Sequence, residues 1–172
     1  MPRPKIHLPK SAADYWLELG SLASLLLLVF VSFSGFVRVP TTIPFRFGMD
    51  GWPDLYPSRI RFGLLPFLGV VVYAVGQLLT LRPHRFSYPA RITPANAAVH
   101  YRNAIRLLQF VLAWLLLSMS YLQFRTARAE AGLYGGPSLL VAILLLVLLV
   151  SGGWYFLRPL LATSQRMIVN RA

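Results

Sequence analysis

The residues of this chain that are best suited to bind a ligand lie between its first two apolar segments, at positions 39–59. Asp50 and Asp54 could ligate a hard cation such as Ca²⁺ together with loop carbonyl groups, and Arg46 could bind a phosphate through its planar guanidinium. Each residue also fits a structural role, because aspartate is common in turns and arginine stacks on aromatic rings. Two carboxylates without a third favour the turn role, so we expect no metal and no cofactor.

Prolines and glycines shape this loop. Pro40 and Pro44 predict a short extended segment over residues 42–47, because proline disfavours helix in the residue before it. Asp50-Gly51 predicts a turn, and the Trp-Pro-Asp sequence at 52–54 predicts another. The loop is therefore expected to be compact and ordered on the outer face of a membrane. Its candidate recognition residues are Pro44, Arg46, Phe47, Asp50, Gly51, Pro53, Asp54 and Arg59.

The loop also carries a family-like pattern. In order, its fixed positions are Val39-Pro40, Ile43-Pro44, Phe47, Gly51, Pro53-Asp54 and Ser58-Arg59. This pattern resembles the small bacterial membrane-protein domain of unknown function that also forms the N-terminal half of SdpI-type toxin-immunity proteins. The resemblance implies the fold and the family, and it makes immunity to a peptide toxin a candidate function. Arg46 stands where that family usually has His, and the further spans of full SdpI-type proteins have no counterpart here.

Four long apolar segments account for most of the chain. The 172 residues are 56% hydrophobic with a mean hydropathy of +0.60, and only 13% are charged. Segments 19–37, 62–81, 107–124 and 138–157 contain no Asp, Glu, Lys, Arg or His. A helix of about 20 residues crosses a hydrocarbon core of about 30 Å. We therefore predict an all-α, four-span transmembrane bundle in one integral membrane domain, 1–172, with spans near 16–37, 61–81, 103–124 and 138–157.

The basic residues predict the orientation. Lys and Arg outnumber Asp and Glu by 17 to 5. Segments 1–18, 82–106 and 158–172 carry 11 of these basic residues, and the other two connections carry 6. The positive-inside rule therefore predicts a multi-pass protein of the cell membrane with cytoplasmic N- and C-termini. The first apolar segment is longer than the core of a signal peptide, and Asp14 and Glu18 interrupt its approach, so we expect it to remain as a span.

Little chemistry is expected inside the spans. His7, His84 and His100 are scattered at the predicted inner surface. An enzyme or an active transporter would need ionisable groups within its spans, and the apolar blocks contain none. Gln77 and Gln109 lie at similar depth on consecutive antiparallel helices, so we predict a hydrogen bond between them. The alternative is that each amide bonds a backbone carbonyl or reaches water. The basic residues form no continuous face, which argues against nucleic acid as a partner.

These observations favour a non-enzymatic membrane protein that senses or binds something at the outer face. The expected partners are membrane lipids, with a peptide toxin or another membrane protein as further candidates. A small permease or transporter subunit is the alternative, and its distinguishing feature would be a polar cavity between helices. A lipid-modifying enzyme ranks third, because the sequence contains no recognisable catalytic constellation.

Overall fold

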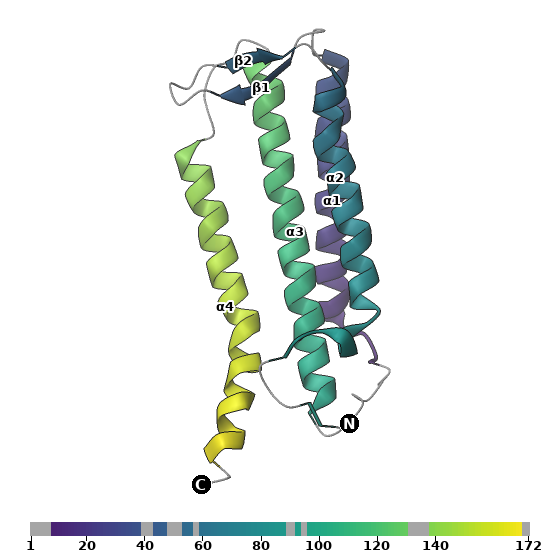
Figure 1. Ribbon diagram of the computed structural model, residues 1–172, viewed down its shortest axis with the longest axis vertical. Helices are drawn as coiled ribbons and strands as arrows, with labels where there is room; N and C mark the ends of the chain where they lie inside the picture. Colours follow the sequence, from purple (N-terminus) through teal and green to yellow (C-terminus); the bar gives the residue numbers. More distant parts are fainter. Residues whose placement is uncertain are drawn as a thin grey trace.

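The computed structural model of the protein is a bundle of four long helices with a two-stranded hairpin at one end (Figure 1). It describes residues 8–38, 43–47, 53–56, 59–88, 92–93, 96–130 and 138–169, and their side chains over 8–37, 63–88, 92–93, 96–128 and 138–158. The elements are α1 (Ala12–Arg38), β1 (Ile43–Phe47), β2 (Pro53–Tyr56), α2 (Arg59–Thr80), the 3-10 helix η1 (Pro83–Arg85), α3 (Ala97–Glu130) and α4 (Leu139–Val169).

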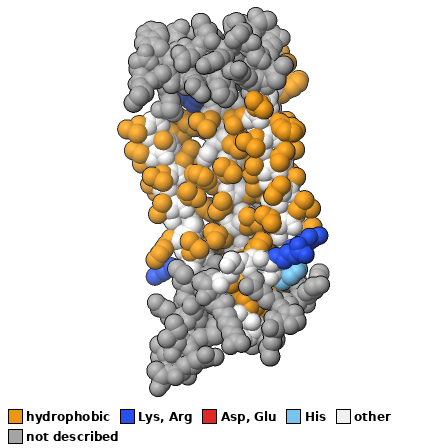
Figure 2. Space-filling model, viewed as in Figure 1, with side chains coloured by type: hydrophobic (Ala, Val, Ile, Leu, Met, Phe, Trp, Pro, Cys, Tyr) orange, Lys and Arg blue, Asp and Glu red, His pale blue; other side chains and the backbone are white. Residues whose placement is uncertain are grey.

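The predicted four-span architecture is confirmed. Four helices are long and apolar enough to cross a membrane, at 12–37, 63–80, 97–128 and 139–158. Hydrophobic side chains cover the middle of the bundle, and Lys and Arg side chains lie toward its ends (Figure 2). Consecutive helices run in opposite directions, so α1 begins and α4 ends at the same end of the bundle, which we call the termini end; the hairpin marks the other, hairpin end.

Two helices begin earlier than their apolar residues because side chains cap them. Ser11 precedes α1, and its backbone N–H donates to Oδ2 of Asp14 at 2.8 Å, as in a capping box. Ahead of α3, the Thr93 N–H donates to Oδ1 of Asn96 at 2.8 Å, and the Thr93 carbonyl accepts from the Ala97 N–H at 2.9 Å. Helical hydrogen bonding therefore starts at Thr93. Both early starts bring charged residues into the helices.

The first three helices form the core of the bundle. Leu28 of α1 and Leu112, Leu116 and Met119 of α3 are buried together. The α2 backbone approaches closely at two glycines: a Cβ added at Gly69 would collide with the Leu28 side chain, and one at Gly76 would lie 2.8 Å from the Leu112 side chain. Small residues at such positions let membrane helices pack closely without a hydrophobic driving force between them.

Helix α4 packs against α3 and is otherwise turned away from the bundle. No residue of its apolar stretch is buried, as expected for a helix largely surrounded by lipid. The contact with α3 is nevertheless specific, because Trp114 Nε1 donates to the Leu145 carbonyl at 2.7 Å and the Ser138 N–H donates to the Tyr121 hydroxyl at 2.9 Å. At Gly152 the α4 backbone meets the ring of Phe110, which leaves no room for a side chain.

The loop between α1 and α2 contains an antiparallel hairpin. Strand β1 matches the predicted extended segment at 42–47. The turn predicted at 52–54 is wrong for Pro53 and Asp54, which belong to strand β2. The backbone register pairs Pro44 with Leu55 and Arg46 with Asp54, with an irregularity between Pro44 and Arg46. Proline is tolerated there because it can occupy the first residue of an edge strand or a bulge.

Candidate functional site: a polar cavity at the termini end

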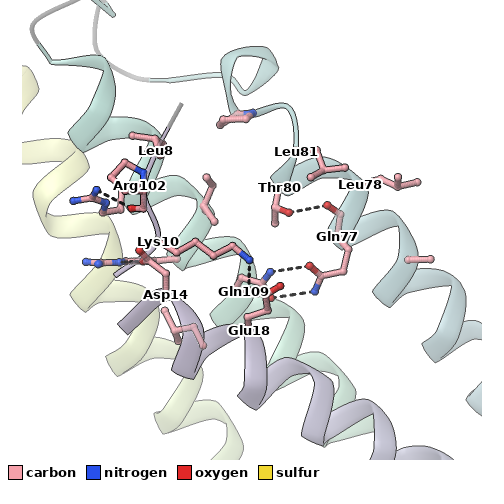
Figure 3. Close-up of a pocket in the computed structure, with 16 residues that line it drawn as sticks. Leu8, Lys10, Asp14, Glu18, Gln77, Leu78, Thr80, Leu81, Arg102 and Gln109 are labelled. Carbon is pink, nitrogen blue, oxygen red and sulfur yellow. Dashed lines mark hydrogen bonds and ion pairs between the residues drawn. The ribbon is translucent and has the colours of Figure 1, made fainter. Parts of the chain in front are cut away.

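A cavity of about 610 Å³ opens between α1, α2 and α3 at the termini end (Figure 3). Its walls combine charged and amide side chains with leucines, which is the composition of many small-ligand sites. Its polar lining residues are Lys10, Asp14, Glu18, Gln77, Thr80, Arg102, Arg106 and Gln109. Its apolar lining includes Leu8, Leu17, Leu78, Leu81 and Ile105.

One wall of the cavity is an ion pair between α1 and α3. Arg106 Nε donates to Asp14 Oδ1 at 2.6 Å, and its Nη2 donates to the Ser11 hydroxyl at 2.8 Å. The Ser11 hydroxyl in turn donates to Asp14 Oδ2 at 2.9 Å. Asp14 therefore caps its own helix and fixes the position of α3 at the same time. The pair is only partly accessible, with exposed side-chain fractions of 24% for Arg106 and 13% for Asp14.

A second ion pair, between Lys10 and Glu18, also lines the cavity. Lys10 Nζ donates to Glu18 Oε2 at 2.6 Å, and both side chains are exposed. The hydrogen bond to Glu18 raises the pKa of Lys10 above its ordinary value, so this ammonium stays charged at neutral pH. Because the two groups are exposed and flexible, this pair contributes little to stability and can exchange partners with a ligand.

An amide pair lines the cavity on the side toward the middle of the bundle. Gln109 Nε2 donates to Gln77 Oε1 at 3.1 Å, and Gln77 Nε2 lies 3.4 Å from Gln109 Oε1. The Ser21 hydroxyl donates to the same Gln109 oxygen at 2.8 Å. The predicted hydrogen bond between Gln77 and Gln109 is confirmed, and Ser21 extends it to α1. Interhelical polar contacts of this kind contribute about 0.6 kcal/mol each on average.

Arg102 is the least satisfied charge of the cavity. Its Nη2 donates to the Pro9 carbonyl at 3.3 Å, a long contact, and its Nε is buried without a hydrogen-bond partner among the described residues. Within the same part of the chain, both carboxylates that line the cavity are already paired, Asp14 with Arg106 and Glu18 with Lys10. A guanidinium carries five donors, and burying a charge without a partner is unfavourable. Arg102 therefore leaves a place for an anion.

Comparison of the chain with family models, with curated proteins and with solved structures finds no match. The resemblance of residues 39–59 to the SdpI-type domain therefore stays a prediction. The cavity has to be interpreted from its own chemistry.

The expectation that the spans hold no ionisable group in a pocket is wrong. The apolar blocks are uncharged, but α1 and α3 continue beyond them for two or more turns and carry Asp14, Glu18, Arg102 and Arg106 to the cavity. A signal was present in the sequence: these residues recur at intervals of four, at 14 and 18 and at 102 and 106. Residues four apart share one face of a helix, so each pair points the same way.

His100 also differs from its expected place at the inner surface. Its side chain is buried with 1% exposure, and its ring lies edge-on to Tyr88 at a centroid distance of 6.2 Å. Neither ring nitrogen has a hydrogen-bond partner among the described residues. His84 is half-buried in η1, and His7 lies outside the described residues. Within the described part of the chain, no three His, Cys, Asp or Glu side chains gather as a metal site would require.

The structure places part of the predicted recognition loop. The backbone brings Arg46 and Asp54 to paired positions on β1 and β2, with Pro44 and Phe47 on β1, Pro53 on β2 and Arg59 at the start of α2. Asp50 and Gly51 lie outside the described residues. These positions are at the hairpin end, so the predicted loop and the cavity are two separate candidate sites at opposite ends of the bundle.

Proposed function

We propose that the protein is a non-enzymatic, multi-pass protein of the cell membrane that binds an amphipathic molecule in the cavity between α1, α2 and α3. The observation that carries this proposal is the mixed lining of the cavity. Ion pairs and amides form one part of the wall, and leucines form the rest. A volume of about 610 Å³ lies within the roughly 300–1,000 Å³ of known ligand pockets.

The charge distribution supports a position of this cavity in the cytoplasmic leaflet. The positive-inside rule counts 11 Lys and Arg residues in the segments at the termini end, against 6 at the other end. With both chain ends cytoplasmic, the ion pairs of the cavity lie at the level of the inner lipid headgroups. A ligand would then enter from the inner leaflet or from the cytoplasm.

The packing above the cavity favours binding over transport. The lining ends at Glu18, Ala74 and Gln109. Beyond it toward the hairpin end, Leu28 and Leu116 are fully buried, so the helices pack closely there. A small permease subunit is the alternative function. The polar cavity between helices is the feature expected of it, but transport would also need a second conformation in which the helices separate at Leu28 and Leu116. Catalysis is not supported, since the carboxylates and two of the cations are held in pairs.

A substitution at Ala74 tests the proposal. Ala74 lines the cavity from α2, so Ala74→Trp should fill the space without removing any polar lining group. We expect the wild-type protein to retain a lipid or small-molecule adduct in mild detergent and the variant to lose it, as measured by native mass spectrometry. Val75→Trp is the matched control, because Val75 is the next residue, is 50% exposed and does not line the cavity. Equal adduct occupancy in both variants would refute a ligand site in the cavity.

Recognition at the hairpin end is the second candidate function. It is supported by the pairing of β1 with β2 and by the packing of β1 against α2 and α3, which give the loop a defined backbone. Binding of a peptide toxin or of another membrane protein would take place on this outer face.

Arg46→Ala tests this second function. A charge on a hairpin strand contributes about 1 kcal/mol or less to stability, so melting in detergent should hardly change. Recovery of an anionic or aromatic partner in a pull-down from native membranes should fall. If the variant instead unfolds while binding per folded molecule is unchanged, Arg46 is structural and the outer-face assignment is wrong.

A further inference from the structure

We propose that the ligand of the cavity is an anionic phospholipid whose phosphate binds Arg102. This inference rests on the proposed function and names its ligand class. It draws on three observations: the state of Arg102, the charge balance of the lining, and the apolar surface that leads out of the cavity.

Among the residues whose side chains are described, no carboxylate forms an ion pair with Arg102. The chain has five acidic residues. Asp14 and Glu18 are engaged by Arg106 and Lys10. Asp50 and Asp54 belong to the segment between α1 and α2, and Glu130 ends α3, about 42 Å from Arg102 at 1.5 Å per residue. The planar fork of a guanidinium matches two oxygens of a phosphate, and hydrogen bonds of this charge-assisted type are the strong ones.

The lining has an excess of one positive charge. It holds three cations, Lys10, Arg102 and Arg106, and two carboxylates, Asp14 and Glu18. A headgroup with one net negative charge would neutralise this excess, whereas a zwitterionic headgroup would leave it. Lys10 lines the same cavity, and its described contacts, the exposed pair with Glu18 and the Tyr15 ring 5.6 Å from its Nζ, are ones that a flexible side chain can give up for a phosphate oxygen. The cavity should therefore prefer anionic over zwitterionic phospholipids.

The apolar wall identifies the rest of the ligand. Leu78 and Leu81 line the cavity from the end of α2, and they are also 62% and 74% exposed. The same side chains thus belong both to the cavity lining (Figure 3) and to the exposed surface of α2 and its C-terminal end. Acyl chains can follow these leucines out of the cavity into the bilayer while the headgroup stays beside Arg102. A free phosphate compound would leave this wall without a partner.

The test compares four probes on the full-length protein in detergent: dioleoyl phosphatidylglycerol, dioleoyl phosphatidylcholine, glycerol 3-phosphate and inorganic phosphate. Native mass spectrometry titrations give the affinity for each. We expect phosphatidylglycerol to bind best. Arg102→Gln should lower the affinity for this lipid about tenfold or more, as loss of a charge-assisted hydrogen bond predicts. The affinity of Arg102→Lys should lie between those of the wild type and Arg102→Gln, because lysine keeps the charge but lacks the planar fork of the guanidinium.

Arg85→Gln is the matched control. Arg85 is an exposed residue of η1 at the same end of the bundle and does not line the cavity, so this variant removes the same charge without touching the site. We expect Arg85→Gln to bind phosphatidylglycerol with wild-type affinity and Arg102→Gln to melt at the wild-type temperature. The lower affinity of Arg102→Gln would then be due to the cavity. If both variants lower the affinity for phosphatidylglycerol equally, the effect comes from general surface charge and the inference is wrong.

Three other results would also overturn it, and they separate it from the proposed function. If Arg102→Gln binds phosphatidylglycerol like the wild type while Ala74→Trp does not, the cavity binds a ligand without using Arg102, and only the inference fails. If glycerol 3-phosphate or inorganic phosphate binds as tightly as the lipid, the ligand is a soluble phosphate compound. If Ala74→Trp binds phosphatidylglycerol normally, both the inference and the proposed function are wrong.

Discussion

Asp14→Ala should lower the free energy of unfolding by about 2–4 kcal/mol, the largest effect we expect from a single polar side chain. The substitution removes the N-terminal cap of α1 and leaves Arg106 without its carboxylate. Loss of a cap costs about 1 kcal/mol, and breaking a fully buried pair costs about 3–5 kcal/mol. The residual exposure of the two side chains reduces the second value. Reversible unfolding in mixed micelles would measure the change.

A double-mutant cycle with Arg106→Leu separates the two contributions. The double variant should be more stable than the sum of the single effects predicts, because it removes both charges and leaves neither one buried alone. Lys10→Ala is the control, since it breaks the exposed pair with Glu18 and should cost at most about 1 kcal/mol. A loss for Asp14→Ala no larger than that for Lys10→Ala would show that the pair between α1 and α3 does not hold the helices together.

Gly152→Leu should separate α4 from α3. The ring of Phe110 occupies the space that a side chain at this position would need, and Phe110 also stacks against Phe156 of α4 at a centroid distance of 5.6 Å. Overpacking at such a contact costs about 1–3 kcal/mol. We therefore expect a lower melting temperature in detergent and faster proteolysis between α3 and α4.

The neighbouring glycine provides the control for this substitution. A Cβ at Gly153 would meet no atom within 4 Å, so Gly153→Leu should be nearly neutral. In addition, Phe110→Ala should partly rescue Gly152→Leu, because it vacates the space that the new leucine needs. Equal melting of the two glycine variants would contradict the close packing of α4 on α3.

The spans were predictable because their signal is local. A run of about 20 uncharged residues has few stable structures other than a membrane helix, whatever the rest of the chain does. The pairing of Gln77 with Gln109 was also predictable, since depth in a span follows from counting residues at 1.5 Å each along consecutive antiparallel helices. In the same way, Pro40 and Pro44 limited the backbone around β1 to extended conformations.

The cavity was not predicted, because it depends on where the helices end and on how they pack. Counting apolar blocks treats Glu18 and Arg106 as flanking charges, yet both lie inside helices that caps have lengthened. Which charges then face one another depends on the rotation of α1 against α3, and contacts such as Gly69 against Leu28 help to set how the helices approach. Strand β2 was missed for a related reason: its four residues pair only because β1 lies beside them.

The attachment of α4 through α3 has a consequence for the order of assembly. Every described residue that lines the cavity lies between Leu8 and Gln109, so this lining is complete before α4 is synthesised. The ion pair of Asp14 with Arg106 and the amide pair of Gln77 with Gln109 can form as soon as the third helix enters the bilayer. Membrane helices insert first and associate afterwards, and chains generally fold from the N-terminal end during synthesis. If the cavity binds a ligand as proposed, the nascent three-helix intermediate would already be able to bind it before α4 joins the bundle.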